Sequence, residues 1–179
     1  MSDRLVLVLG GTRSGKSRFG LSRARELAGS TPVAYLATAW PGDPELDRRI
    51  EGHRRERPAS WPTVDVGPDL AAAILSVDPS LSILLDGLTL WVSTVAGDGE
   101  PDIDAILEGP VARALEAIRD RAGPVIVVSD EIGLGMVPMD AGARSFRDLL
   151  GITHQRVAAQ AHEVYFMVAG LPMTLVRMP

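Results

Sequence analysis

The sequence predicts a three-layer α/β fold, with a mostly parallel sheet flanked by helices, from two features of its pattern. Short and almost wholly apolar runs, such as residues 5–9 and 125–129, are typical of strands buried on both faces of a parallel sheet. Amphipathic, helix-like stretches separate these runs, so strand, helix and strand follow one another as in a right-handed βαβ unit. With 179 residues, 46% of them hydrophobic, the chain can form one substantial core, and we expect a single domain over residues 1–179.

The composition argues against several classes of protein. The formal net charge is −5 and 4% of the residues are aromatic, whereas general nucleic-acid binding relies on positive charge and base stacking. The absence of cysteine excludes disulfides and thiolate metal sites. No apolar run approaches the ~20 residues that a membrane helix needs, and the N-terminus lacks the pattern of a signal peptide. We therefore expect a cytoplasmic protein.

A glycine-rich stretch between the first strand and the first helix fits the phosphate-binding pattern G-x-x-x-x-G-K-[ST]. It consists of Gly10, Gly11, Thr12, Arg13, Ser14, Gly15, Lys16 and Ser17. Its glycines allow the tight turn that directs backbone N–H groups at an anion, and the following helix adds the partial positive charge of its N-terminus. Lys16 would reach the β- and γ-phosphates of a nucleoside triphosphate, and the Ser17 hydroxyl would bind Mg²⁺.

The remaining elements follow from apolar periodicity, helix caps and turn residues. Gly29 is a helix stop signal, while Asp43 and Pro44 are start signals for a helix that Pro58 ends. In chain order we expect helices over residues 17–28, 43–57, 69–77, 103–121 and 141–162. We expect strands over residues 5–9, 33–38, 81–86, 125–129, 163–169 and 173–177, an irregular segment over 58–67, and a turn at 170–172.

Acidic residues lie at the ends of two predicted strands. Asp86 ends one strand, and Asp130 follows another. Because the carboxyl ends of parallel strands meet at one edge of a sheet, both acids and Thr38 should lie at the same edge as the glycine-rich loop. There Asp86 would hold Mg²⁺ or its water shell opposite Ser17, unless it serves only as a turn residue.

Arginines gather in the segment 48–57, which contains Arg48, Arg49, Arg54, Arg55 and Arg57. On the predicted helix, His53 shares a stripe with Leu46, Ile50 and Arg57. One interpretation is a solvated helix with ion pairs such as Glu51–Arg55, in which His53 is a packing residue. The other is a phosphate-binding surface, in which the neutral imidazole of His53 is a nucleophile. The spacing of these residues along the helix is compatible with both interpretations.

Seven motifs extend the pattern beyond the glycine-rich loop. They are Gly-Gly-Thr-Arg-Ser-Gly-Lys-Ser (10–17), Tyr-Leu-Ala-Thr-Ala (35–39), Arg-Ile-x-x-His (49–53) running into Arg-Pro-x-x-Trp-x-Thr (57–63), Leu-Asp-x-Leu-Thr-Leu-Trp-Val (85–92), Asp-Glu-Ile-Gly-x-Gly-x-Val-Pro (130–138), Arg-x-Phe-Arg-Asp-x-x-Gly (144–151) and Gly-Leu-Pro (170–172). In order and spacing the chain resembles the bifunctional adenosylcobinamide kinase/adenosylcobinamide-phosphate guanylyltransferase family of cobalamin biosynthesis.

The resemblance implies a P-loop NTPase fold of the RecA-like type and two reactions that use Mg²⁺, ATP and GTP. Adenosylcobinamide, a corrinoid, is phosphorylated first, and its phosphate then attacks a GMP carried on a histidine of the enzyme, which gives adenosylcobinamide-GDP. The histidine in the matching motif is His53. The same match implies that the nucleotide site includes, besides the loop, Ala37, Thr38, Ala39, Arg54, Arg55, Glu56, Arg57, Asp65 and Asp86. It also implies a homotrimer with sites near subunit boundaries.

The sequence departs from the family pattern at a few positions. Asp65 stands where relatives often have Glu, Asp130 where Asn is usual, and His154 where an Asn-Gln pair is usual. His162 stands at a position that is usually acidic. Neither His154 nor His162 has a metal-ligand companion at i+4, so we interpret both as surface or packing residues.

Two other functions fit the glycine-rich loop. A monofunctional kinase of a small metabolite would use Lys16 and Asp86, with His53 as a structural residue. A nucleotide-dependent switch would turn over slowly and report the γ-phosphate to a partner through residues 133–138.

Overall fold

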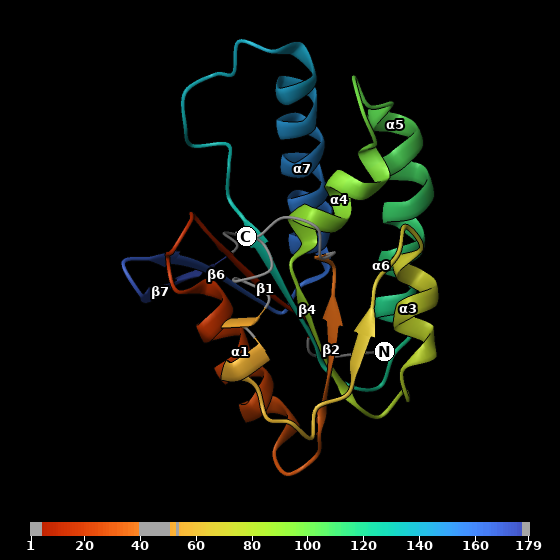
Figure 1. The fold of residues 1–179 in the computed structure, drawn as a ribbon, viewed down its shortest axis with the longest axis vertical. Helices are drawn as coiled ribbons and strands as arrows, with labels where there is room; N and C mark the ends of the chain where they lie inside the picture. The colour runs from red at the N-terminus through yellow and green to blue at the C-terminus, as the bar shows by residue number, and fades with distance from the viewer. Residues whose placement is uncertain (1–4, 40–50, 53, 177–179) are drawn as a thin grey trace.

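The described residues form a seven-stranded sheet in the order β3-β2-β4-β5-β1-β6-β7 (Figure 1). The computed structural model describes residues 5–39, 51–52 and 54–176. The strands are β1 (Leu5–Gly10), β2 (Val33–Ala37), β3 (Thr63–Asp65), β4 (Ser82–Asp86), β5 (Val125–Asp130), β6 (Glu163–Val168) and β7 (Leu171–Leu175). All neighbouring strands are parallel except β6 and β7, which are antiparallel. The prediction of a mostly parallel sheet is therefore confirmed.

Helices cover both faces of the sheet and make the fold three-layered (Figure 1). They are α1 (Lys16–Ala28), α3 (Leu70–Ser76), α4 (Leu88–Ala96), α5 (Ile103–Ile106), α6 (Ala112–Arg119) and α7 (Ala141–Gln160). Val6 and Val8 of β1 belong to the apolar cluster beneath α1, whereas Leu5 and Leu7 belong to the larger cluster on the opposite face. Because both faces of β1 are buried, its residues do not alternate between polar and apolar. Among the described helices, none combines the length and apolar character needed to cross a bilayer.

Two elements of the sheet region were not predicted. The segment 58–67 was expected to be irregular, but Thr63–Asp65 pairs with β2 as the edge strand β3. Three residues are too few to show a period in the sequence. Helix α4 begins after Gly87, which provides no side-chain cap, so the usual start signal is missing.

Several predicted boundaries were wrong in detail. The helix expected over 103–121 is interrupted by a π-helical segment, Leu107–Val111, which contains Pro110. Proline cannot donate an intrahelical hydrogen bond, which accounts for a break at this point. The turn expected at 170–172 lies at Ala169 and Gly170, whose φ angles are 52° and 81°, and β7 begins directly after it.

The other boundaries differ by one or two residues, and one predicted helix is only partly described. Helix α1 begins at Lys16, and α7 ends at Gln160. Residues 51–52 and 54–56 are helical, as expected for the helix over 43–57. The rest of that helix, apart from Arg57, lies outside the described residues.

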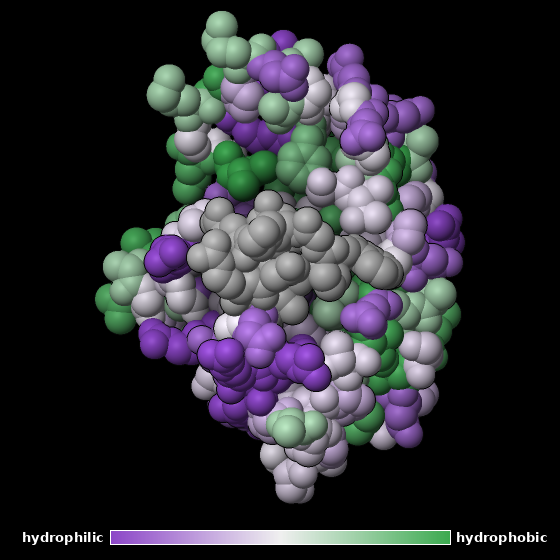
Figure 2. Space-filling model, viewed as in Figure 1, coloured by the Kyte–Doolittle hydropathy of each residue, from purple (hydrophilic) through white to green (hydrophobic). Residues whose placement is uncertain are grey.

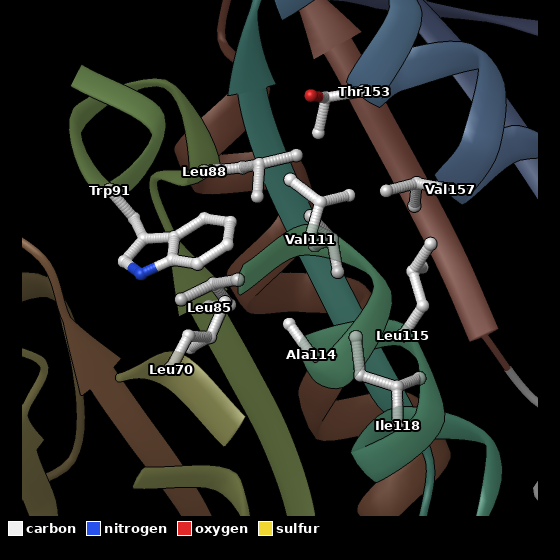
Figure 3. Close-up of a pocket in the computed structure, with 11 residues that line it drawn as sticks. Leu70, Leu85, Leu88, Trp91, Val111, Ala114, Leu115, Ile118, Thr153 and Val157 are labelled. Atoms are coloured by element: carbon white, nitrogen blue, oxygen red, sulfur yellow. The ribbon is translucent and has the colours of Figure 1, made fainter. Parts of the chain in front are cut away.

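The core beneath the sheet contains one small cavity, shown in Figure 3. It measures about 10 Å³ and is lined by residues of α3, β4, α4, the π-helical segment, α6, β5 and α7. The one hydroxyl in its lining, that of Thr153, donates to Leu149 O at 2.8 Å. The cavity is too small for a ligand, so it is a packing defect of the core.

Candidate nucleotide site

The loop between β1 and α1 has a tight shape that depends on glycine. Ser14 N donates to Gly11 O at 3.2 Å, and Arg13 and Gly15 have φ angles of 57° and 93°. Glycine adopts such an angle without steric cost. A Cβ at Gly10 would lie 2.5 Å from Ser14 Oγ, so a larger residue there would displace the loop.

The inner side of this loop is suited to binding an anion. The first intrahelical bond of α1 runs from Phe19 N to Gly15 O at 3.0 Å, so the N–H groups before it have no partner within the helix. The buried Ser14 hydroxyl has no hydrogen-bond partner within the described part of the chain. A phosphate group would accept hydrogen bonds from such donors and would be favoured by the helix dipole.

Lys16 extends from the loop to the end of β5. Its Nζ lies 2.5 Å from Asp130 Oδ1 and 3.4 Å from Gly11 O. Asp130 is beside the loop because it pairs with Gly10 in the ladder between β1 and β5. The structure therefore places the loop cation against one of the strand-end acids.

Asp86 lies on the other side of the loop, at the end of β4. Its Oδ1 accepts a hydrogen bond from Ser17 Oγ at 3.4 Å, and its Oδ2 accepts one from the Tyr35 hydroxyl at 3.3 Å. Burial, together with the Asp86 charge, raises the pKa of Tyr35 well above its usual range, so the phenol remains a donor.

The oxygens of Ser17 and Asp86 fit Mg²⁺, which prefers oxygen ligands. No group of three or more His, Cys, Asp or Glu side chains in the described residues could hold a metal by itself. This donor set suits a metal held by one or two protein oxygens together with substrate phosphates and water.

The ends of β2, β3 and β4 adjoin the same site. Thr38 Oγ1 donates to Gly87 O at 2.8 Å and accepts from Gly87 N at 3.0 Å, which ties the end of β2 to that of β4. Asp65 is exposed at the end of β3, paired in register with Ala37. Ala39 is half-buried just beyond β2. Thr38 therefore lies at the same sheet edge as Asp86, as the strand-end argument predicted, and Asp65 and Ala39 are close by.

The described part of the arginine-rich segment, residues 51–52 and 54–57, is largely exposed. Arg54, Arg55 and Glu56 are all exposed. Arg55 lies 3.6 Å from Glu51, an i,i+4 ion pair of the kind that the solvated-helix interpretation predicts. His53 lies outside the described residues, so its role stays a prediction.

Among the described arginines of this segment, Arg57 connects with the site. Its guanidinium carbon lies 4.0 Å from the centroid of the Tyr35 ring, and the hydroxyl of Tyr35 contacts Asp86. Arg25 of α1 holds the same segment by donating to Glu56 O at 2.9 Å. The end of the segment is thereby attached to the side of the site that contains Asp86.

A buried polar network lies behind the end of β5. His154 Nε2 is 2.7 Å from Ser129 Oγ, which is 2.9 Å from Thr89 Oγ1. Thr89 Oγ1 in turn accepts from Asp130 N at 2.8 Å. Burial lowers the pKa of His154, and the nearby carboxylates of Glu131 and Asp130 oppose this shift only in part. The neutral imidazole is therefore a packing residue that fixes the strand end.

Tyr35, Thr89 and Ser129 were not predicted as residues of the site. Ser129 carries a usable signal, since it directly precedes Asp130 at a predicted strand end. Thr89 belongs to the helix that was not predicted. The third histidine, His162, is exposed at the opposite end of the sheet, where its Nδ1 accepts from Leu5 N at 3.4 Å.

Comparison with known proteins identifies the family of this chain. Residues 6–175 match the family model described as cobinamide kinase / cobinamide phosphate guanyltransferase. The chain is 41% identical over 170 residues to the "Bifunctional adenosylcobalamin biosynthesis protein CobP" of Pseudomonas aeruginosa, covering 94% of this chain and 95% of that protein. It is 35% identical over 179 residues to the "Bifunctional adenosylcobalamin biosynthesis protein CobU" of Escherichia coli, covering 93% and 97%.

Solved structures with the same fold are more distant in sequence. One structure of an ATPase domain has a TM-score of 0.54 at 16% identity, over 93% of this chain and 70% of that one. An ATPase from the type III secretion system of pathogenic bacteria has a TM-score of 0.56 at 10% identity, over 97% and 57%. These likenesses establish a P-loop NTPase fold.

Proposed function

Because the chain belongs to the cobinamide kinase / cobinamide phosphate guanyltransferase family, we propose that it catalyses both reactions in cobalamin biosynthesis. It phosphorylates adenosylcobinamide with a nucleoside triphosphate, and it then transfers GMP from GTP through a guanylyl-histidine to give adenosylcobinamide-GDP. The main structural support is that the loop meets the strand-end acids at one edge of the sheet, where Ser17 contacts Asp86 and Lys16 contacts Asp130. We place both reactions in the cytoplasm.

In the kinase step the loop binds and orients the triphosphate. Backbone N–H groups and the Ser14 hydroxyl donate to phosphate oxygens, and Lys16 balances charge on the β- and γ-phosphates. Ser17 and Asp86 would hold Mg²⁺, which would supply further charge neutralisation when bound. The oxygen of the substrate hydroxyl then forms a bond to the γ-phosphorus as the bond to the leaving nucleoside diphosphate breaks, and the hydroxyl proton passes to solvent.

In the guanylyl step His53 is the nucleophile. Its neutral nitrogen forms a bond to the α-phosphorus of GTP, pyrophosphate leaves with the bonding electron pair, and the imidazole proton passes to solvent. The phosphate of adenosylcobinamide phosphate then attacks the same phosphorus, and the N–P bond breaks. The neighbouring Arg54, Arg55 and Arg57 attract the phosphates.

We assign nucleotide binding to residues on the loop, the strand ends and the arginine-rich segment. They are Gly10, Gly11, Thr12, Arg13, Ser14, Gly15, Lys16, Ser17, Ala37, Thr38, Ala39, Arg54, Arg55, Glu56, Arg57, Asp65 and Asp86.

A homotrimer, which the family resemblance implies, would need interfaces between copies of the chain, and exposed apolar residues are available for them. Leu171, Met173 and Val176 in and just after β7 are 69%, 55% and 82% exposed, and Met136 and Met139 before α7 are 94% and 97% exposed. Figure 2 shows hydrophobic surface at both places. Such surface is typical of protein interfaces.

The decisive experiment is incubation with α-labelled GTP. We expect label bound to wild-type protein that survives alkali, is lost in mild acid, and leaves when adenosylcobinamide phosphate is added. His53→Asn should abolish the label and keep much of the kinase activity, since phosphoryl transfer needs positioning and charge but no covalent relay. His162→Asn is the matched control and should label normally.

Other outcomes of this experiment would indicate a different nucleophile or a different function. Label that persists in His53→Asn, or that maps to His154 or His162, contradicts the assignment. Kinase activity without any label on the wild-type protein indicates a monofunctional kinase. Very slow turnover with nucleotide-dependent binding of a partner indicates a switch.

A further inference from the structure

The cation that should bind phosphate already has a partner. Lys16 Nζ lies 2.5 Å from Asp130 Oδ1, and the side chain of Lys16 is 10% exposed, against 35% for Asp130. Opposite charges at this distance largely cancel each other. A triphosphate that binds in the loop must therefore compete with a carboxylate for Lys16.

The main chain of Asp130 is fixed on several sides. Its N–H donates to Thr89 Oγ1 at 2.8 Å, and the N–H of the next residue, Glu131, donates to Gly10 O at 3.1 Å. The hydroxyl of Thr89 is itself held through Ser129. The contact with Lys16 can therefore break by rotation of either side chain, while the fixed main chain keeps the Asp130 carboxylate beside the loop.

Displacement of the Asp130 carboxylate from Lys16 has different consequences for bare and for metal-complexed nucleotides. A bare triphosphate brings several negative charges and leaves the Asp130 carboxylate facing them without a counter-charge. A divalent cation bound to the triphosphate reduces that negative charge and attracts the freed carboxylate. The carboxylate therefore opposes the bare anion more strongly than the metal complex.

We propose that Asp130 is a specificity-determining residue, which competes with phosphate for Lys16 and thereby makes the loop select metal-complexed triphosphates over bare ones. This inference rests on the proposed nucleotide site. It adds that Asp130 makes this site prefer the metal complex of a triphosphate to the bare triphosphate. Because the side chain of Asp130 is 35% exposed, its displacement from Lys16 does not disturb the core, so the selectivity acts on binding and not on folding.

Asp130→Asn is the informative variant. Asparagine has nearly the same shape, and its carbonyl oxygen can still accept a hydrogen bond from Lys16, so only the charge is lost. The equilibrium dissociation constant of ATP is measured by calorimetry at low ionic strength, once with EDTA and once with Mg²⁺. Compared with wild type, we expect about 10-fold tighter binding in EDTA and a change of less than about 3-fold in Mg²⁺.

Glu131→Gln is the matched control, because it removes the same charge one residue later. Its side-chain oxygen can still accept from Gly133 N, as Glu131 Oε1 does. The ratio of the two dissociation constants should stay within about 2-fold of wild type in this variant. If Asp130→Asn does not fold, Asp130→Ser tests the same loss of charge.

The outcomes separate this inference from the proposed function. Wild-type protein that binds no nucleotide in either buffer overturns the nucleotide site itself. Wild-type protein that binds ATP, with an Asp130→Asn variant whose binding in EDTA is unchanged or weaker, overturns only the selectivity assigned to Asp130. An equal effect of Glu131→Gln overturns it as well, because general charge would then account for the change.

Discussion

Gly20→Ala tests how closely α1 packs on the sheet behind the loop. Gly20 is buried, and an added Cβ would lie 2.6 Å from Val128 Cγ2 of β5 and 3.5 Å from Leu84 Cδ1 of β4. The first contact is too short, so α1 or β5 must move. Overpacking costs about 1–3 kcal/mol, while the better helix propensity of alanine returns about 1 kcal/mol. We therefore expect a net loss of about 1 kcal/mol in the free energy of unfolding.

Val128→Ala provides the second side of a double-mutant cycle. It removes both γ-methyl groups from a fully buried side chain and should cost about 2 kcal/mol. In that background the methyl group added at Gly20 has room, and only the gain in helix propensity remains. Gly20→Ala should then stabilise the protein by about 1 kcal/mol, a coupling of about 2 kcal/mol between the two sites.

Urea unfolding of the four proteins measures this coupling. Nucleotide affinity provides a second readout, because a displaced α1 carries the loop with it: affinity should fall in Gly20→Ala and recover in the double variant. If Gly20→Ala costs the same in both backgrounds, within about 0.5 kcal/mol, the inferred close contact is wrong.

Four further predictions concern the site and its scaffold. Lys16→Ala should abolish both the kinase and the guanylyl activity, because one phosphate-binding loop serves both nucleotides; near-normal guanylyl transfer would contradict this. Asp86→Asn should raise the Mg²⁺ concentration needed for turnover while the melting temperature changes little, and the reverse pattern would make Asp86 a structural residue. Arg121→Met should lower the free energy of unfolding by about 3–5 kcal/mol, because the buried guanidinium donates to four backbone carbonyls between residues 74 and 81. A loss below about 1 kcal/mol in urea unfolding would refute that estimate. Hydrogen bonds from Arg23 lower the pKa of Glu163, so the stability that this carboxylate contributes is present above its unfolded-state pKa and is lost as the pH falls through its folded-state pKa. The difference in unfolding free energy between wild type and Glu163→Gln should therefore shrink between about pH 7 and about pH 3. A difference that stays constant over this range would contradict the prediction.

Much of the site was predictable because its signals are local in the sequence. The glycine spacing from Gly10 to Gly15 reflects a turn that the backbone makes within a few residues. The apolar runs predicted the buried strands, and the strand-end rule predicted that Asp86 and Asp130 would lie beside the loop. The failures also have local causes: β3 is too short to show a period, and α4 has no capping side chain.

The sequence by itself therefore determined the loop, the parallel strands and the edge at which the polar residues meet, since each depends on neighbours along the chain. Only the tertiary structure decided which acid faces which loop residue. Strand β5 lies between β1 and β4, so Asp130 meets Lys16 while Asp86 meets Ser17 and Tyr35. Strand order depends on pairing between segments far apart in the chain and on the helices packed over them, and no local pattern encodes it.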